Sequence, residues 1–310
     1  MIGIDIGGAN VKIATDDGVE TIYCPLWEGA PLGEILSRYR TADGAAAVVM
    51  SGELADCFCT KMEGIAWITK TVREVFPAAL FYGTDGRFYD SAVPALAAAN
   101  WLASAACLHA RDPDGLLVDM GSTTTDIVPL RPLSALYGLT DLLRLQKGYL
   151  VYTGLLRTTV PAVIRTVTLE GVPTPISAEQ FAISADAHLV LGHIGEADYS
   201  CDTPDRKGRD RIACLRRLAR VVCADLDEIG EEGAVQVAET FWEAQQDTIR
   251  AAVRKAMEES GAIRIYTAGA GSGLLAASLG GVDLSVELGA GASALPAYAV
   301  SEVLRRSRGC

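Results

Sequence analysis

The sequence predicts an α/β protein with two lobes. Two segments carry this prediction, because each has the pattern of a strand, a glycine-containing polar turn and a second strand: residues 2–14, IGIDIGGANVKIA, and residues 118–128, VDMGSTTTDIV. In both, an Asp precedes the glycine. The chain has 310 residues, 50% of them apolar and 21% charged, which is enough for two hydrophobic cores.

The first part of the chain continues the opening pattern. A third strand is expected near residues 20–24, then a helix at 32–39, a buried strand at 45–50 and a helix at 64–75 that ends before Pro77. Residues 93–110 are so rich in Ala and Ser that they predict a helix whose small side chains let another element approach closely.

The second part repeats this architecture. Residues 116–130 again give strand, polar turn and strand, which indicates an old duplication, although the identity between the halves is too low to be a sequence repeat. Residues 198–210 are a charged loop, residues 210–259 are strongly helical, and residues 263–279 predict strand, glycine loop and helix. We expect an N-terminal lobe of residues 1–92 with 286–310, and a C-terminal lobe of residues 93–285 with an inserted substrate region.

The charge and the cysteines limit the class of protein. The formal net charge is -12 and the acidic residues are scattered, so we expect no nucleic-acid partner. No run of about 18 uncharged apolar residues occurs, so we expect no membrane partner, no signal peptide and a cytoplasmic protein. Of eight cysteines, the closest pair, Cys57 and Cys59, is one residue too tight for the usual zinc spacing, which favours reduced structural thiols. The sequence leaves open whether the protein forms a homodimer.

Five segments occur in the order typical of one superfamily. They are residues 5–8 (DIGG), the Ala-rich segment 93–107, residues 119–123 (DMGST), residues 267–271 (TAGAG) and residues 289–292 (GAGA). They resemble the phosphate-1, connect-1, phosphate-2, adenosine and connect-2 motifs of the actin, sugar-kinase and Hsp70 superfamily. The resemblance spans nearly the whole chain and implies an actin-like, ribonuclease H-like two-lobe ATPase fold with an interlobe cleft.

Within that superfamily, DMGSTTTDIV is most similar to the hydantoinase and oxoprolinase branch. SGELADCFCTKMEGI (residues 51–65) and DRKGRDRIACLRRLARVVCAD (residues 205–225) resemble its archaeal members of one-carbon metabolism, which act in methanofuran biosynthesis. This resemblance implies an ether-forming transferase that joins a phenolic amine to a furan diphosphate and releases diphosphate.

In such a fold the two turns meet across the cleft, so Asp5 and Asp119 would converge and hold a hydrated Mg²⁺ that bridges to phosphate oxygens. Glycine in the turns lets backbone N–H groups approach an anion. The residues expected to bind the diphosphate, or a nucleotide if one is used, are Gly7, Gly8, Asn10, Gly121, Ser122, Thr123 and Thr124.

Several other candidate site residues have more than one interpretation. Lys12 is a phosphate contact or a solvated lysine, and Gly269, Gly271 and Ser272 form a nucleotide site or a simple strand-to-helix turn. The general base is Asp119, Asp126 or His188, although a buried histidine is more often structural. Arg206, Lys207 and Arg209 form a basic island that is either exposed or reaches an anionic substrate.

Departures from the superfamily pattern bear on the function. Ala9 replaces the usual Ser or Thr of the first turn, and Ala270 replaces the second glycine of the adenosine motif, which weakens the case for ordinary ATP hydrolysis. Three functions therefore compete: the transferase, a small-molecule kinase in which Asp119 is the base, and a nucleotide-dependent conformational module.

Overall fold

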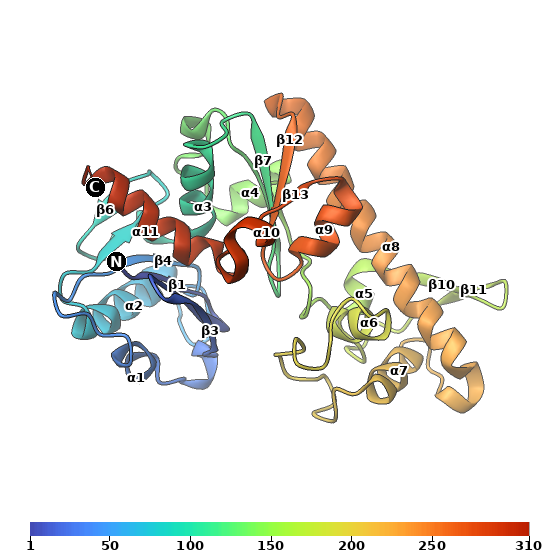
Figure 1. Cartoon of the computed structure of the whole chain (residues 1–310). Helices are drawn as coiled ribbons and strands as arrows, with labels where there is room; N and C mark the ends of the chain where they lie inside the picture. Colours follow the sequence, from blue (N-terminus) through green and yellow to red (C-terminus); the bar gives the residue numbers. More distant parts are fainter. Residues whose placement is uncertain (310) are drawn as a thin grey trace.

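The computed structural model describes residues 1–309 and contains two large β-sheets (Figure 1). The first sheet consists of β1 (Gly3–Ile6), β2 (Asn10–Thr15), β3 (Gly18–Tyr23), β4 (Ala47–Met50), β5 (Leu80–Tyr82) and β6 (Phe88–Tyr89). The second consists of β7 (Gly115–Met120), β8 (Thr125–Pro129), β9 (Leu150–Val151), β12 (Arg264–Ala268) and β13 (Val282–Asp283). A separate hairpin is formed by β10 (Thr166–Leu169) and β11 (Val172–Pro175).

The two sheets repeat one topology. Their strand orders are β3-β2-β1-β4-β5-β6 and β13-β12-β7-β8-β9. In each, an antiparallel meander, β1-β2-β3 or β7-β8-β9, is extended on the other side of its first strand by two parallel strands, β4-β5 or β12-β13. This repeat confirms the duplication of architecture that the two strand-turn-strand segments predicted.

Helices cover both faces of the sheets. The α-helices are α1 (Leu32–Ser37), α2 (Lys61–Val75), α3 (Asn100–His109), α4 (Asp141–Lys147), α5 (Val160–Val163), α6 (Ser184–Val190), α7 (Arg211–Arg220), α8 (Leu226–Ser260), α9 (Ser272–Leu279), α10 (Ser285–Leu288) and α11 (Leu295–Ser307). Short 3-10 helices are η1 (Leu26–Glu28), η2 (Pro94–Leu96), η3 (Leu133–Leu136) and η4 (Gly289–Ala292). No helix among the described residues combines the length and apolarity that a membrane crossing requires.

Three hydrophobic cores hold these layers together. One joins the first sheet to α1 and α2, and another joins the second sheet to α6, α7 and α8. The third contains residues of β4, β7, β8, α3 and α11, so α3 and α11 lie between the sheets (Figure 1). The small side chains Ala103, Ser104 and Ala105 of α3 are buried there. A Cβ on Gly3 of β1 would lie 1.9 Å from the carbonyl oxygen of Ala297 in α11, so glycine is needed at this contact.

Two predicted helices are shorter than expected. Residues 93–99 do not join α3, because Pro94 begins a separate 3-10 turn and Ala98 adopts a left-handed φ of 47°, which no α-helix accommodates. The helical stretch 210–259 is divided between α7 and α8 by a turn at Cys223, φ 60°, and α8 itself is kinked at Gly230. Apolar periodicity continues across these breaks, so it did not reveal them.

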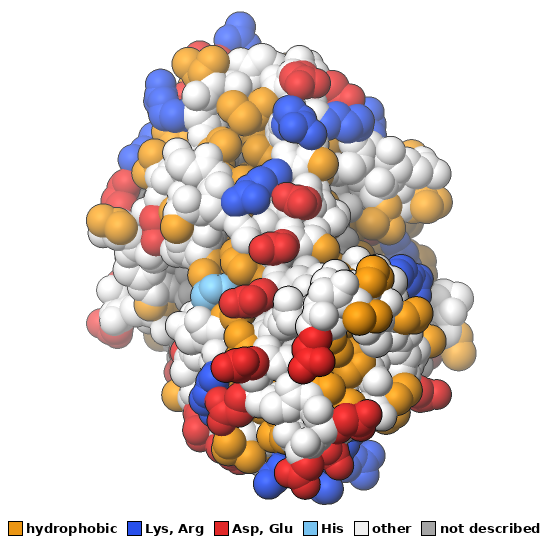
Figure 2. All heavy atoms as spheres, turned by 90° about the vertical axis from the view of Figure 1, so that its right-hand side faces the viewer, with side chains coloured by type: hydrophobic (Ala, Val, Ile, Leu, Met, Phe, Trp, Pro, Cys, Tyr) orange, Lys and Arg blue, Asp and Glu red, His pale blue; other side chains and the backbone are white. Residues whose placement is uncertain are grey.

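The lower half of the outer face that carries α8 is rich in acidic side chains, whereas Lys and Arg side chains lie over its upper half (Figure 2). Apolar side chains lie between the acidic ones. An anionic substrate would therefore depend on local positive charge to overcome the field of the whole molecule.

Candidate active site

Side-chain alternation directs Asp5 toward the other lobe. In β1, Ile4 and Ile6 enter the core with α1 and α2, so Gly3 and Asp5 point to the opposite face, where Gly3 contacts α11. Asp5 is 3% exposed and is the second-last residue of its strand.

Asp119 has the equivalent position in the second sheet. In β7, Val118 and Met120 pack into the core with α8, which directs Asp119 to the face shared with α3 and α11. It is 8% exposed, and it too is the second-last residue of its strand. The duplicated topology thus presents one carboxylate from each lobe to the region between the sheets.

Lys12 and the two aspartates share one electrostatic environment. Lys12 lies opposite Asp5 in the β1–β2 register, with 4.0 Å between its Nζ and Asp5 Oδ2. Burial raises the pKa of Asp5 to about 6 and the pKa of Asp119 to about 7, while the Lys12 ammonium acts against both shifts. The negative charge of Asp126 raises both values further, and that of Asp5 raises the pKa of Asp119. The four predicted residues are therefore near enough for their charges to interact.

The two turns offer unused hydrogen-bond donors. Each turn is closed by one backbone bond, Gly7 N to Asn10 O and Gly121 N to Thr124 O, both 2.9 Å. Within residues 1–309, the N–H groups of the next residues, Gly8 and Ala9 in one turn and Ser122 and Thr123 in the other, donate to no protein acceptor. A Cβ on Gly8 would meet no atom within 4 Å. Such clusters of free N–H groups are suited to an anion.

The donor set fits Mg²⁺ held by two carboxylates. Oδ1 of Asp5 is buried without a hydrogen-bond partner, which is costly unless a cation or donor completes the site. The described residues contain no group of three or more His, Cys, Asp or Glu arranged around one point. Mg²⁺ commonly takes one or two protein carboxylates and fills its remaining positions with water and phosphate oxygens.

Asp126 is held in an ion pair that the sequence did not predict. Arg144, a buried residue of α4, contacts Asp126, donates to Asp141 at 2.9 Å and stacks on Trp101 with 4.3 Å to the ring centre. Arg144 lies 18 residues from Asp126, so no local pattern could have linked them. With its carboxylate paired to Arg144, Asp126 is placed to stabilise the turn and is poorly placed as a general base.

The structure corrects the assignment of His188. Its side chain is fully buried; Nδ1 lies 2.9 Å from Nδ1 of His193, and Nε2 lies 3.0 Å from Oε1 of Gln245. Burial lowers the pKa of His188 to about 3, so the ring is neutral. Both nitrogens are occupied and no substrate can reach them, which excludes His188 as the general base. Gln245 in turn donates to Thr153 at 2.7 Å, so His188 supports the loop below the second turn.

The glycine loop after β12 packs closely against β7 and η4. Gly269 N donates to Ala292 O at 2.9 Å, Gly271 N to Met120 O at 3.1 Å, and Ser272 N to Gly269 O at 3.2 Å. The Ser272 hydroxyl is buried and bonded to Thr267 O at 2.8 Å. These three backbone N–H groups are therefore not available to a ligand, whereas the N–H groups of Ala270 and Gly273 donate to no acceptor within residues 1–309, so the nucleotide site stays a prediction. A Cβ on Gly269 would lie 2.3 Å from Asp119 Oδ1, which shows why glycine is needed there.

Glu53 is a buried carboxylate that the sequence analysis missed. It is 2% exposed and its Oε2 has no hydrogen-bond partner. Burial raises the pKa of Glu53 to about 7. It follows Gly52, which packs directly against Gly7 of the first turn. An available signal was its place immediately after the buried strand β4, next to β1 in the sheet.

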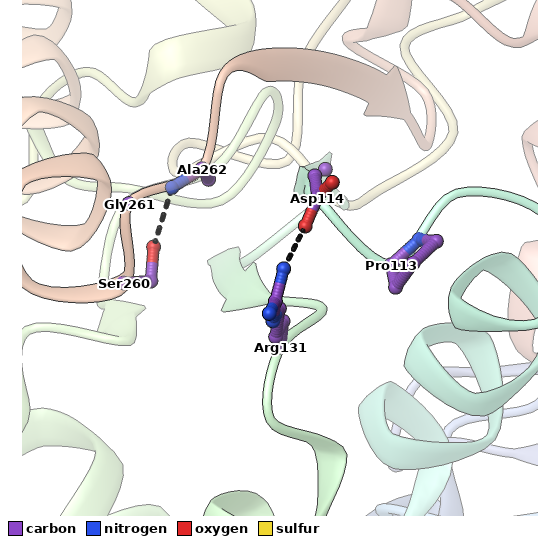
Figure 3. A pocket seen from close by; sticks show the side chains of 7 residues that line it. Pro113, Asp114, Arg131, Ser260, Gly261 and Ala262 are labelled. Carbon is purple, nitrogen blue, oxygen red and sulfur yellow. Dashed lines mark hydrogen bonds and ion pairs between the residues drawn. The ribbon is translucent and has the colours of Figure 1, made fainter.

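A cavity of about 250 Å³ lies away from these turns (Figure 3). Pro113, Asp114, Arg131 and Ser260 line it, and Asp114 is paired with Arg131 at 2.7 Å. Its wall includes Gly115, the first residue of β7, whereas Asp119 lies near the other end of that strand, roughly 13 Å away along the chain. This cavity is therefore separate from the aspartates.

Comparison with known proteins identifies the family. The family model for hydantoinase/oxoprolinase matches residues 44–307. The chain belongs to the hydantoinase/oxoprolinase family. A family member from Methanocaldococcus jannaschii, named (4-{4-[2-(gamma-L-glutamylamino)ethyl]phenoxymethyl}furan-2-yl)methanamine synthase, is 35% identical over 99% of this chain and 98% of its own length. A protein of the same name from Methanococcus vannielii is 39% identical over 57% of this chain and 79% of its own length.

A solved structure of the same architecture supports the fold assignment. The nucleotide-free structure of acetone carboxylase superposes with a TM-score of 0.52 at 8% sequence identity, over 97% of this chain and 69% of that chain. Together with the duplicated sheets, this confirms the actin-like two-lobe fold. At such low identity the likeness concerns the fold alone.

Proposed function

We propose that this family member is an ether-forming transferase of methanofuran biosynthesis. The phenol oxygen of γ-glutamyltyramine attacks the methylene carbon of an aminomethylfuran that carries a diphosphate. A C–O bond to the phenol forms as the C–O bond to diphosphate breaks, the electron pair leaves with the diphosphate, and the phenol proton passes to a base. The products are the aryl ether and inorganic diphosphate.

The proposal rests first on the relatives. Two proteins that are 35% and 39% identical to this chain carry the name of a synthase whose product contains a phenoxymethyl-furan ether. Within the site, the strongest support for the proposal is the pair of facing turns. Each turn has free N–H groups beside a buried aspartate. A diphosphate has oxygens enough to accept hydrogen bonds from both turns at once.

The residues of the turns would hold the leaving group. N–H groups of Gly8, Ala9, Ser122 and Thr123 point to an anion site, and the Lys12 ammonium adds positive charge. Asp5 and Asp119 would hold Mg²⁺. When bound, Mg²⁺ supplies positive charge that neutralises the developing diphosphate.

Asp119 is the best placed of the three candidate bases. Asp126 is paired with Arg144 and His188 is fully enclosed, whereas the Asp119 carboxylate accepts no hydrogen bond within residues 1–309. ATP has no role in this proposal, in keeping with a glycine loop whose N–H groups at 269, 271 and 272 are already used.

The test is the identity of the released phosphate species. Purified protein is incubated with γ-glutamyltyramine and the furan diphosphate in Mg²⁺, with and without ATP, and inorganic diphosphate, ADP and coupled product are measured. We expect diphosphate and ether in equal amounts without ATP. Product formed only when ATP is hydrolysed, or phosphorylation of a small alcohol, would favour the kinase.

A further inference from the structure

A second cavity, of about 380 Å³, lies between the two lobes and has charges of both signs in its wall. Glu28 of η1 lines it from the first lobe. The other lining residues come from the charged loop that precedes α7: Asp202, Thr203, Arg206, Lys207 and Arg209.

This cavity adjoins the two turns of the active site. Leu26 N, at the start of η1, donates to Gly8 O at 2.9 Å, and Glu28 follows two residues later, roughly 4 Å along the helix. From the other lobe, Arg157 N donates to Ser122 O at 2.9 Å, and the Arg157 guanidinium lies 4.9 Å from the ring centre of Trp27. Trp27 and Arg157 thus bridge the lobes between the turns and the cavity.

The charged side chains of this cavity are unpaired. Among residues 1–309, neither the basic trio Arg206, Lys207 and Arg209 nor the acidic pair Glu28 and Asp202 forms an ion pair within 4 Å. All five of these charged residues are exposed, so a ligand from solvent can reach them. Opposite charges that line one cavity without meeting leave room for a ligand that carries both.

The loop that presents the basic trio is rigidly held. Asp205 accepts from Arg217 at 3.0 Å and from Arg220 at 3.1 Å, and Arg217 is fully buried against Asp186. The Thr203 hydroxyl donates to Lys207 O at 3.0 Å. Arg206 adopts φ 56°, a left-handed conformation that is uncommon for a residue with a side chain. A fixed loop loses little entropy when a ligand binds.

We infer that this cavity binds the α-amino-acid end of the phenolic substrate, an inference that rests on the proposed function. In a γ-glutamyl amide, the α-carboxylate and the α-ammonium are both free. The basic trio receives the carboxylate, while Glu28 and Asp202 receive the ammonium. The extended substrate spans about four residues of chain, roughly 13 Å, from its α-carbon to the phenol oxygen, so its two ends can occupy neighbouring parts of one cleft.

The diphosphate of the other substrate is the less suitable occupant. Glu28 and Asp202 would repel a polyanion, and the free N–H groups of the turns already provide for it. The geometry therefore assigns the two substrates to neighbouring parts of one cleft, with the reacting atoms between them.

The test compares Arg206→Gln and Glu28→Gln with Arg254→Gln, an exposed arginine of α8 that forms no ion pair in the described chain. We expect the KM for γ-glutamyltyramine to rise at least tenfold in the first two variants, with kcat and the KM for the furan diphosphate unchanged, and no effect of Arg254→Gln. An analogue with an α-carboxamide should bind the wild type as weakly as it binds Arg206→Gln. Isothermal titration with γ-glutamyltyramine alone provides a readout that needs no turnover.

The outcomes separate the two claims. If the wild type forms product and both variants behave like Arg254→Gln, the cavity assignment is wrong and the proposed function stands. If the KM for the furan diphosphate rises instead, the basic trio binds diphosphate and the inference is overturned. If no product forms, the titration with γ-glutamyltyramine decides. Binding to the wild type that is tenfold weaker in Arg206→Gln supports the cavity assignment. Equal binding to both proteins, or no binding to either, refutes it.

Discussion

In the proposed reaction, Asp119 is the residue on which the chemistry depends most. It is buried, accepts no hydrogen bond within the described chain and carries a raised pKa because burial disfavours its charge. A carboxylate in this condition contributes little to folding, since removing a poorly solvated charge relieves the cost of burying it. Residues of this kind are typical of functional sites.

We therefore predict that Asp119→Asn lowers the rate of ether formation at least about 100-fold while the melting temperature stays the same or rises. Product formation and thermal unfolding are measured on the same preparation. Asp114→Asn, which changes an exposed residue just before β7, is the matched control and should retain activity. Parallel losses of activity and stability in Asp119→Asn would indicate a structural role.

The buried carboxylate of Glu53 should make the stability of the protein depend on pH. Its folded pKa of about 7 lies above the ordinary value of 4.5, so the folded state holds the proton more tightly than the unfolded state. The resulting stabilisation is complete below about pH 4.5 and is lost as the pH rises to about 7. Glu53→Gln should remove this dependence, which amounts to at most about 3 kcal/mol.

The measurement is urea unfolding of both proteins between pH 5 and pH 8. We expect the difference in unfolding free energy between Glu53→Gln and wild type to grow in favour of the variant as the pH rises. Glu258→Gln, an exposed position on α8, controls for the loss of one negative charge. A difference that does not change with pH would show that Glu53 is not protonated in the folded protein.

At the scale of elements, the loop after β12 supports the catalytic strand. Gly269 has φ 83°, and its missing side chain lets the loop pack against Asp119 and Met120. The loop thus sets the position of Asp119, which lies on β7, the strand next to β12 in the sheet.

Gly269→Ala should cost about 3 kcal/mol of stability and should also lower activity, because a Cβ would strain the backbone and displace Asp119. Gly280→Ala separates the two effects, since Gly280 has a similar φ of 67° and open space around its Cβ position. That variant should lose only about 1 kcal/mol and keep its activity. The midpoints of urea unfolding and the rates of ether formation are compared. If Gly269→Ala and Gly280→Ala lose the same stability and the same activity, backbone strain alone explains the effect of Gly269→Ala.

At the scale of the whole molecule, the two lobes meet through α3, α11 and the core between the sheets. Each lobe contributes one turn and one aspartate to the same site, so a bound diphosphate would contact both. The lobe boundaries near residues 93 and 286 stay a prediction.

Inorganic diphosphate with Mg²⁺ should stabilise the protein by about 2.7 kcal/mol at 100 times its dissociation constant, because it binds only the assembled cleft. The shift in melting temperature is recorded with diphosphate, with diphosphate and a chelator, and with ATP. We expect the chelator to remove most of the shift and ATP to give a smaller one. Diphosphate should also compete with the furan diphosphate. A larger shift with ATP would favour the kinase.

The sequence alone determined the duplicated fold, the two aspartates and the glycine turns. These features are local: alternation along a strand, a glycine at a turn and an Asp at a fixed offset are properties of a few consecutive residues. The order of five such segments indicated the superfamily, and DMGSTTTDIV indicated the family that residues 44–307 match.

Only the tertiary structure decided how the remaining charged groups are used. The pairing of Arg144 with Asp126, the enclosure of His188 by Gln245 and the cavity between Glu28 and Arg206 each join residues at least 18 positions apart. Whether a histidine is a base or a core residue, and whether an arginine is exposed or faces a ligand, depends on burial and on partners from distant elements. Those quantities arise when the two sheets pack against α3 and α11, and no short stretch of sequence contains them.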